Sequence, residues 1–229
     1  MEPSSGYFGG CLRFLREHYT EAASALSRMG FAMSATPDTT APPTALAERP
    51  KRADARRNYD KLVTTAREVF AEQGSDATLE EISRRAGGGI GTLYRHFPAR
   101  ENLVEAAYLD GVEEICAAVA THEGEDPWEA LKGWLLELVG FAATKRVLAD
   151  EMFAYLDRGA PVFKTCSSAI YDAAEPLLKR AQEAGEVRDD VDILDVTRMV
   201  SGIAALRTVE RDQVERLVGI ALDGLRPSA

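Results

Sequence analysis

A glycine-rich stretch followed by polar and aromatic residues is the part of this sequence whose residue types and spacing could do chemistry. Residues 86–97 read AGGGIGTLYRHF, in which the glycines run into Thr92, Tyr94, Arg95 and His96. Clustered glycines let backbone amides converge on a phosphate, whereas hydroxyl, imidazole and guanidinium groups donate hydrogen bonds to phosphates and base edges. The stretch is therefore either a phosphate-binding loop or a turn beside a helix that contacts nucleic acid.

The spacing of the glycines argues against a nucleotide-binding loop. Such a loop follows a strand and has the pattern GxxxxGK[ST] or GxGxxG. Here the preceding residues have the pattern of a helix, no lysine follows the glycines, and the third glycine of GxGxxG would have to be Thr92. We therefore exclude the phosphate loop.

The stretch fits a tight turn between two short helices. Gly87 directly follows Ala86 and supplies the positive φ that a steep turn requires. Apolar residues on both sides of the turn can form a small shared core: Ile82, Ala86, Leu93 and Phe97. The polar residues of the second helix then remain free to contact DNA, as in a helix-turn-helix motif whose second helix enters the major groove.

Local signals predict the helices that must hold this turn. An apolar stripe with helical spacing runs from residue 53 to Gly74, a residue suited to end a helix. Thr78 and Glu81 have the spacing of a capping box, which begins a short helix that extends to about Ala86. The second short helix extends to Phe97, where the following proline helps to end it.

The C-terminal half has the pattern of helices only. Asp126 followed by Pro127 predicts a helix start, and Asp212 with Glu215 predicts a capping box for the last helix. The expected helices cover about residues 100–120, 127–144, 146–157, 162–184 with a bend near Pro176, 193–206 and 213–225. No segment alternates with period two, so we expect an all-α fold.

Composition divides the chain into three parts. Residues 1–52 are predicted to be an N-terminal extension and flexible linker, because residues 34–50 are rich in Pro, Thr and Ala. Residues 53–98 are expected to form the helix-turn-helix domain, and residues 99–229 a second domain that is acidic and helical. Residues 1–32 carry a short amphipathic stripe. They are either dispensable upstream sequence or an extra helix that packs on the body or on a partner.

The net charge of −10 is concentrated in the C-terminal part of the chain. Residues 51–108 hold 10 Lys+Arg and 9 Asp+Glu, whereas residues 109–229 hold 13 and 23. The segment KRADARRNYDK, residues 51–61, is the most basic patch. A patch of this kind alone is commonly a solvated face, but beside a helix-turn-helix it favours contact with phosphates.

The composition predicts a protein of the cytoplasm. No run of about 18 apolar residues is present, so we expect no membrane span. The first residues lack the basic and apolar regions of a secretory signal. Cys11, Cys116 and Cys166 have neither zinc-site spacing nor the even count of a disulfide framework, which favours a reducing compartment.

An enzyme and a protein-binding adaptor are the two other classes of function to which an acidic, all-helical chain could belong. A di-iron helical bundle needs Glu three residues before a metal-binding His, and none of His18, His96 and His122 has it. No spacing suggests a catalytic triad, so we expect no enzyme activity, no metal and no cofactor. A helical adaptor that binds protein and not DNA stays open, and DNA binding that is absent or insensitive to salt would favour it.

Residues 56–108 closely resemble the N-terminal DNA-binding domain of tetracycline-repressor-like (TetR) transcriptional regulators. The motifs VFAEQG, TLEEI and GTLYRHFP occur in the family's order and spacing within these 53 residues. The remaining acidic, helical part is similar to the family's ligand-binding and dimerisation domain in layout and length. The resemblance implies a ligand-responsive dimeric repressor whose partners are double-stranded operator DNA and an unidentified small molecule.

The resemblance also implies roles for individual residues. Thr92, Tyr94 and His96 would lie at the DNA surface, the last two on the phosphate backbone, and Arg95 has a more variable role. Thr78 and Arg100 would contact phosphates, as a capped helix start and a guanidinium favour anions.

The basic residues before the helix-turn-helix and the glycine at position 88 lead to two further predictions. Arg56 and Arg57 could reach flanking phosphates or the minor groove. The family usually has a buried aliphatic residue where this chain has Gly88. A missing side chain there predicts a looser second helix in the free protein, and we expect Gly88→Val to raise the melting temperature if a pocket exists.

The last two helices carry apolar faces suited to a four-helix bundle across a dimer axis, although an ordinary intrachain core would show the same pattern. The residues predicted for this interface are Val196, Val200, Ile203, Val214, Leu217, Val218 and Ala221.

Aromatic and apolar residues between the two ends could line a ligand cavity or simply form the core. These residues are Trp134, Phe141, Met152, Phe153, Phe163, Cys166 and Tyr171. The acidity around them would suit a cationic ligand, but it also keeps this part of the chain from binding DNA non-specifically.

Overall fold

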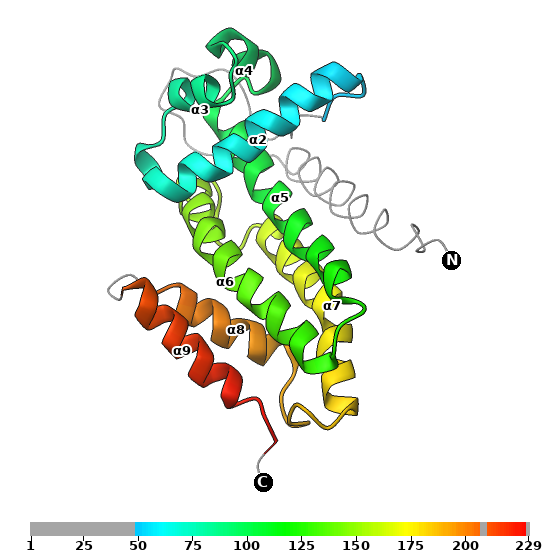
Figure 1. Ribbon diagram of the computed structural model, residues 1–229. Coiled ribbons are helices and arrows are strands. Elements are labelled where there is room, and N and C mark those ends of the chain that lie inside the picture. Colours follow the sequence, from blue (N-terminus) through cyan, green and yellow to red (C-terminus); the bar gives the residue numbers. More distant parts are fainter. Residues whose placement is uncertain (1–48, 207–209, 228–229) are drawn as a thin grey trace. The chain divides into compact units, whose positions relative to one another are not determined.

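The computed structural model describes residues 49–206 and 210–227, in which every regular element is a helix and no strand occurs (Figure 1). The predicted amphipathic stripe in residues 1–32 and most of the linker lie outside the described residues. The elements are α2 (Ala53–Gln73), η1 (Gly74–Asp76), α3 (Leu79–Arg85), α4 (Ile90–His96), α5 (Arg100–Ala118), η2 (Val119–His122), α6 (Pro127–Met152), α7 (Pro161–Glu183), α8 (Ile193–Ala204) and α9 (Arg211–Asp223). The all-α fold is thus confirmed.

The helices α2, α3 and α4, with Phe97, form a three-helix unit that we call the head. The apolar stripe of α2 is buried along its length, from Tyr59 to Phe70. Ile82 of α3 and Leu93 of α4 are fully buried, and α3 packs against both neighbours (Figure 1). Phe97 lies 4.8 Å from the Tyr59 ring, centroid to centroid. The predicted small core of the head is therefore present.

The predicted signals at the ends of the head's helices are found where the sequence places them. Gly74 ends α2 with a φ of 61°, and its amide donates to the Phe70 carbonyl. The Thr78 hydroxyl accepts from the Glu81 amide at 3.2 Å and caps α3. The Glu81 carboxylate instead accepts from Arg84 and Arg85 at 2.7–2.8 Å, so only the Thr78 half of the predicted capping box is formed.

The C-terminal helices differ from the prediction in two places. Asp126 caps the helix that Pro127 begins, as expected, with its carboxylate 3.1 Å from the Trp128 amide. However, the two helices expected over residues 127–144 and 146–157 are replaced by one, α6, which ends at Met152, because no proline or capping signal interrupts good helix formers between them. Pro176 is accommodated inside α7.

The second difference concerns the start of α9. The predicted capping box at Asp212 and Glu215 is wrong, because α9 begins at Arg211 with Glu210 as its N-cap residue and no side-chain cap. Asp212 instead lies in the first turn, where a carboxylate favours the positive end of the helix dipole. Asp192 and Asp195 form a full capping box at the start of α8.

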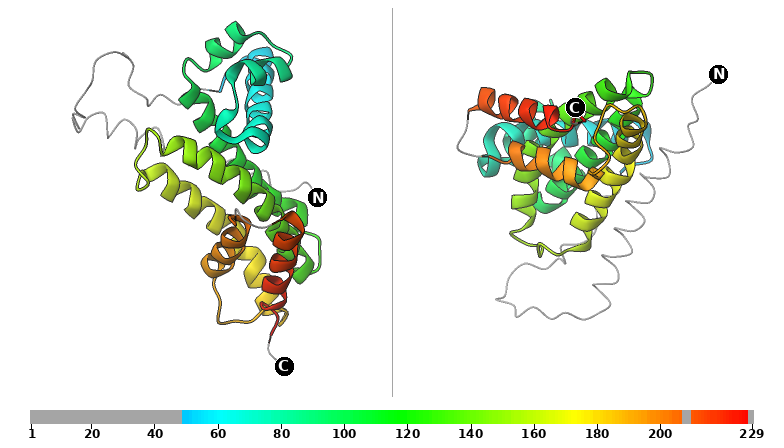
Figure 2. Two further views of the ribbon diagram at one scale, coloured as in Figure 1. Left: turned by 90° about the vertical axis from the view of Figure 1, so that its left-hand side faces the viewer. Right: turned by 90° about the horizontal axis from the view of Figure 1, so that it is seen from below.

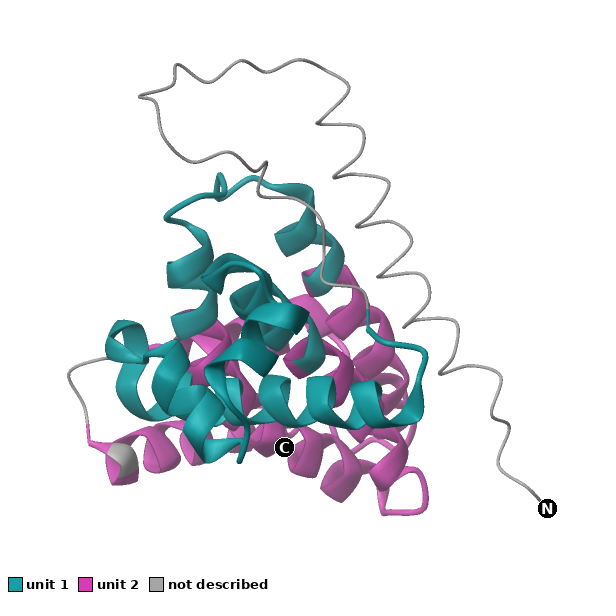
Figure 3. Ribbon diagram, turned by 90° about the horizontal axis from the view of Figure 1, so that it is seen from above, with its two compact units in different colours: residues 1–110, 147–166 teal, residues 111–146, 167–229 magenta. Residues whose placement is uncertain are grey.

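The described chain forms two compact units (Figure 3). Unit 1 holds the residues up to Asp110 and Val147–Cys166, so it contains the head. Unit 2 holds Gly111–Arg146 and the residues from Ser167 onward. In unit 2, α8 and α9 lie side by side in both views of Figure 2. The buried Trp134 donates from its indole nitrogen to the Ile115 carbonyl at 3.0 Å, which anchors α6 on α5 within this unit.

Candidate nucleic-acid interface

The turn between α3 and α4 is built from three consecutive glycines, of which one has a positive φ. Gly87 has a φ of 68°, and its amide donates to the Arg84 carbonyl at 3.0 Å. The Gly88 amide donates to the Ser83 carbonyl at 2.9 Å, and Gly89 begins α4 with extended backbone and no side-chain cap. Only Gly87 needs the left-handed region, which confirms the predicted reason for a glycine at that position.

The helix α4 has a buried inner face and a polar outer face. Leu93 and Phe97 are fully buried in the head, whereas Tyr94 is 46% exposed and Arg95 is exposed. Thr92 lies half-buried on the same turn of the helix. A helix of this length is held in place by its apolar face, so its outer face is free for an external partner.

Arg95 and Thr92 are linked across the outer face of α4. The Arg95 guanidinium donates from Nε to the Gly91 carbonyl at 3.1 Å and from Nη2 to the Thr92 hydroxyl at 3.3 Å. These bonds fold the arginine back along its own helix. Neither of these two bonds uses the third guanidinium nitrogen, Nη1.

His96 lies at the edge of the outer face and packs on α2. Its ring meets the Tyr59 ring edge-on, with centroids 6.2 Å apart and an interplanar angle of 82°. Burial, and then the nearby charge of Arg95, lower the pKa of His96 below its ordinary value. The ring is therefore neutral near pH 7 and carries one N–H donor.

Thr78 and its surroundings form the second candidate contact region. Thr78 is exposed, and because its hydroxyl oxygen accepts from the Glu81 amide, its hydroxyl hydrogen can be donated outward. Hydrogen bonds from Arg84 and Arg85 lower the pKa of the Glu81 carboxyl to about 2. These two arginines are therefore paired within α3.

Arg100 does not have the geometry predicted for it. Its guanidinium donates to the Glu151 carboxylate at 3.0 and 3.1 Å and to the carbonyls of Ala77 and Ser75 at 2.5 and 3.4 Å. It also stacks over the Phe70 ring at 4.9 Å. The sequence could not show this, because the main partner, Glu151, is 51 residues away.

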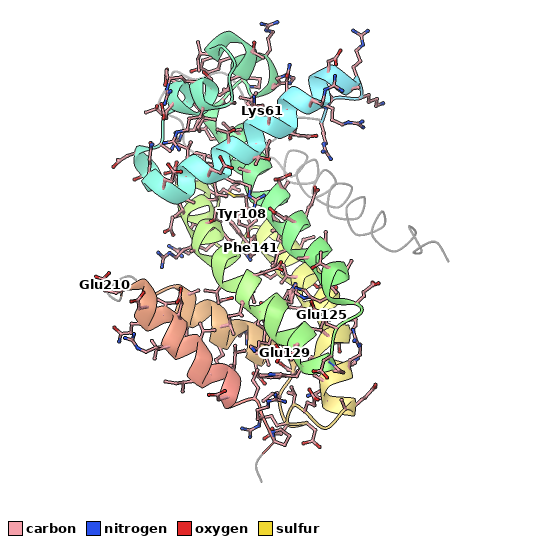
Figure 4. The ribbon with its side chains drawn as sticks, viewed as in Figure 1. Lys61, Tyr108, Glu125, Glu129, Phe141 and Glu210 are labelled. Carbon is pink, nitrogen blue, oxygen red and sulfur yellow. The ribbon has the colours of Figure 1, made fainter. Side chains whose placement is uncertain are left out.

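The basic segment at the start of α2 is exposed. Arg56 and Arg57 both project from the first turns, and Arg57 pairs with Asp54. Lys61, on α2 in Figure 4, was not singled out from this patch, but its ammonium lies 3.3 Å from where a Cβ of Gly87 would stand. The lysine therefore brings positive charge to the turn itself.

Gly88 differs from the expectation of a buried, helix-interior position. It lies in the turn, is exposed, and a Cβ added there would meet only the Ser83 carbonyl, at 3.8 Å. The premise of a missing buried side chain is therefore wrong at this position, because the turn, and not a helix, passes through it.

The predicted ligand-lining residues are distributed over both units. In unit 1, Met152 and Cys166 are buried, and the Phe163 ring lies 4.9 Å from Phe153 and 5.8 Å from Tyr108, centroid to centroid. Burial raises the pKa of Tyr108, labelled in Figure 4, so this residue is a neutral hydroxyl in an apolar cluster. Tyr108 carries no separate signal in the sequence, because it lies among the apolar residues Ala106, Ala107 and Leu109 of α5.

The other predicted lining residues belong to unit 2. Trp134 is buried there, while Phe141 and Tyr171 are half-buried. The Lys145 ammonium lies 5.6 Å from the centre of the Phe141 ring.

The predicted dimer residues separate into inner and outer positions. Val196, Val200 and Val218 are buried within the chain itself. The other four, Ile203, Val214, Leu217 and Ala221, are half-buried. The exposed apolar side chains of this region are Leu206, at 43%, and Ile220, at 68%, which falls outside the predicted stripe.

The described residues contain neither a group of metal-binding side chains nor a membrane-spanning helix. Over residues 49–206 and 210–227, no three His, Cys, Asp or Glu side chains are grouped so as to hold a metal ion. None of the described helices combines the length and apolar character needed to cross a bilayer.

Comparison with known proteins identifies the family to which this helix-turn-helix chain belongs. Residues 62–107 match the family described as bacterial regulatory proteins, tetR family, and residues 126–227 match the C-terminal domain of SbtR-like transcriptional regulators. A TetR transcriptional regulator from Streptomyces coelicolor is 41% identical, with a TM-score of 0.66 over 75% of this chain and 99% of that chain. The chain belongs to the TetR family of transcriptional regulators. It is therefore a DNA-binding regulator of transcription.

Other relatives agree with this membership. A TetR transcription regulatory protein from Mycobacterium vanbaalenii is 35% identical, with a TM-score of 0.62 over 78% of this chain and all of that one. The regulator UidR of Escherichia coli strain K12 is 26% identical over 173 residues, which are 72% of this chain and 88% of UidR. Both halves of this TetR-family chain thus have counterparts in known regulators.

Proposed function

We propose that this TetR-family protein is a dimeric, ligand-responsive repressor that binds a palindromic operator through α4. The observation that carries the proposal is the division of α4 into a fully buried inner face, with Leu93, and an exposed outer face, with Tyr94 and Arg95. A seven-residue helix held in this way presents its outer face to the major groove as a rigid body.

The outer face supplies donors of two kinds. Tyr94 and the neutral His96 donate to phosphate oxygens, and the exposed Thr78 hydroxyl does so from the start of α3. Thr92 and Arg95, joined by a hydrogen bond, face the base edges. The phosphate contacts set the register of the helix, and the base contacts select the sequence.

Basic residues of α2 extend the footprint beyond α4. Arg56 and Arg57 reach phosphates that flank the half-site, or the minor groove beside it, and Lys61 adds charge at the turn. This local excess of cations explains how a chain with a net charge of −10 binds DNA.

The homodimer forms through the outer surface of α8 and α9. Ile220 and Leu206 are large apolar side chains exposed to water in the single chain, and the half-buried Val214 and Leu217 lie on the same helix as Ile220. Burying them against a second copy across a two-fold axis removes this apolar area from water. Two heads then bind half-sites about one helical turn of DNA apart, or a multiple of it.

An apolar effector binds among the predicted lining residues of unit 1 and shifts the protein to a conformation with lower operator affinity. In unit 1 the cluster around Phe163 offers aromatic surface from Tyr108 and Phe153. Because coupling requires different affinities for two conformations, the effector need not approach the DNA. The protein acts in the cytoplasm, has no enzyme activity and requires no cofactor.

Selection of bound DNA from random duplexes tests the proposal. We expect the wild-type protein to enrich a palindrome and the Tyr94→Ala, His96→Ala double variant to lose it. Each hydrogen bond to a charged phosphate is worth at least about 1.5 kcal/mol, so the loss of affinity is on the order of 100-fold for each half-site and about 10,000-fold for the dimer on its palindrome. Lys164→Ala, an exposed residue of α7, is the control and should bind as the wild type does.

Two results would contradict the proposal. If no sequence is enriched and binding is insensitive to salt, the protein is an adaptor that binds protein partners. If the double variant binds the enriched palindrome as well as Lys164→Ala does, α4 is not the contact helix.

A further inference from the structure

The Arg100 guanidinium joins four parts of unit 1 at one point. It donates to the Glu151 carboxylate near the end of α6, to the carbonyls of Ser75 and Ala77, and it covers the Phe70 ring of α2. A planar group with five N–H donors is suited to bonds in several directions at once.

We infer that Arg100 is a positioning residue for the head, and not a DNA-contacting residue, and that Glu151 holds it in place. The inference rests on the proposed function and assigns how the DNA-contacting surface is held. Arg100 acts through the segment that leads into α3.

The two accepting carbonyls lie directly before the start of α3. Ser75 belongs to η1, Ala77 is buried, and Thr78 is the N-cap residue of α3. Bonds from Arg100 to these carbonyls therefore restrain the peptide that carries the Thr78 cap. Because α3 packs on α4, the restraint extends to the helix whose outer face carries Tyr94.

The same geometry argues against a phosphate contact by Arg100. All three guanidinium nitrogens already donate to protein oxygens, and only 29% of the side chain is exposed. The Glu151 carboxylate, 3.0 Å away, would repel a phosphate at this position. To bind DNA, Arg100 would have to abandon the bonds that hold the segment before α3.

Salt-dependent DNA binding by the full-length Glu151→Gln and Arg100→Lys variants distinguishes the two roles. A positioning role predicts that both variants bind the selected operator about 3-fold to 30-fold more weakly, while the slope of log affinity against log salt stays that of the wild type. A phosphate contact predicts the opposite for Glu151→Gln, tighter binding, because an arginine is released to DNA. It also predicts that Arg100→Ala lowers the slope by about 0.9 for each protomer, or about 1.8 for the dimer.

Amide hydrogen exchange in the free protein separates positioning from general loss of stability. We expect faster exchange in residues 79–86 of Glu151→Gln, at equal distance from each variant's melting temperature. The matched control is Asp110→Asn, which removes the charge from one partner of the Arg67–Asp110 pair of unit 1, 3.0 Å in length and formed between α2 and α5. This control should leave both operator affinity and exchange in α3 unchanged.

The outcomes separate failure of this inference from failure of the proposed function. Unchanged exchange in residues 79–86 of Glu151→Gln, or tighter operator binding, overturns the positioning role while the wild-type protein still selects its palindrome. Because the exchange measurement uses no DNA, it decides the question even if no operator is enriched.

Discussion

Gly133 and His122 lie close together in unit 2, and the effect of Gly133→Ala on stability should depend on this contact. We expect the substitution to destabilise the protein when His122 is present and to stabilise it when His122 is replaced by alanine. A Cβ added to Gly133, in the middle of α6, would stand 2.6 Å from Cε1 and 3.0 Å from Nδ1 of the His122 ring. Real Cβ atoms do not approach so closely, so Gly133→Ala must displace the imidazole.

The imidazole cannot move without losing bonds. Its Nδ1 lies 2.9 Å from the Glu125 carboxylate and its Nε2 lies 3.1 Å from the Glu137 carboxylate. Both ring nitrogens must carry hydrogen to serve two carboxylates, which is the charged form. Burial by itself lowers the pKa of His122, but the bonds to Glu125 and Glu137 outweigh it and raise the pKa above its ordinary value.

The magnitude follows from two opposing effects. Overpacking a filled site costs about 1–3 kcal/mol, while replacing a helix-interior glycine by alanine gains about 1 kcal/mol. Gly133→Ala should therefore destabilise the wild-type protein by about 1 kcal/mol. In a His122→Ala background the obstacle is absent, so the same change should stabilise by about 0.5–1 kcal/mol.

Thermal and urea unfolding of the four proteins of this double-mutant cycle, at one protomer concentration, measure the coupling. For a chain of this size, 1 kcal/mol corresponds to a shift of about 2–4 °C in melting temperature. Gly140→Ala is the matched control, since Gly140 is exposed on α6 and a Cβ there meets no atom within 4 Å. It should stabilise both backgrounds equally. Equal effects of Gly133→Ala in both backgrounds would refute the argument.

Three further predictions concern other parts of the chain. The pKa of His122 is raised in the folded protein, so the protonated ring stabilises the fold fully below about pH 6.5, and this contribution is lost as the pH rises through the folded pKa. The melting temperature of the wild-type protein should therefore fall toward that of His122→Gln over this pH range. Gly89→Ser adds a cap to α4 in open space and should raise the free energy of unfolding by a few tenths of a kcal/mol, measured with urea. Ile220→Glu should shift sedimentation from dimer to monomer without lowering helicity, and an unchanged dimer would exclude this face.

The head could be predicted from sequence because its signals are local. Thr78 caps α3, Gly74 and Gly87 adopt positive φ, and the apolar spacing from Tyr59 to Phe70 matches the buried side of α2. Each of these depends on residues within one or two turns of helix, so the linear spacing contains the information. The same is true of the Asp126 cap on α6.

Burial in the C-terminal helices could be predicted only in part. Apolar spacing on α8 and α9 indicates a face that avoids water, but it does not distinguish a core from a dimer interface. The structure places Val196, Val200 and Val218 inside the chain and leaves Ile220 exposed. Which apolar residue remains outside depends on how two helices pack, and spacing along one helix does not encode that.

What the sequence alone determined is therefore the class of fold, the helix-turn-helix and the family, since all of them follow from short-range patterns and motif order. What only the tertiary structure decided is the use of particular charged groups. Arg100 meets Glu151, and His122 meets Glu137, across 51 and 15 residues of chain. Partners at such separations are chosen by packing, because folding brings them within hydrogen-bonding distance and no local signal marks them beforehand.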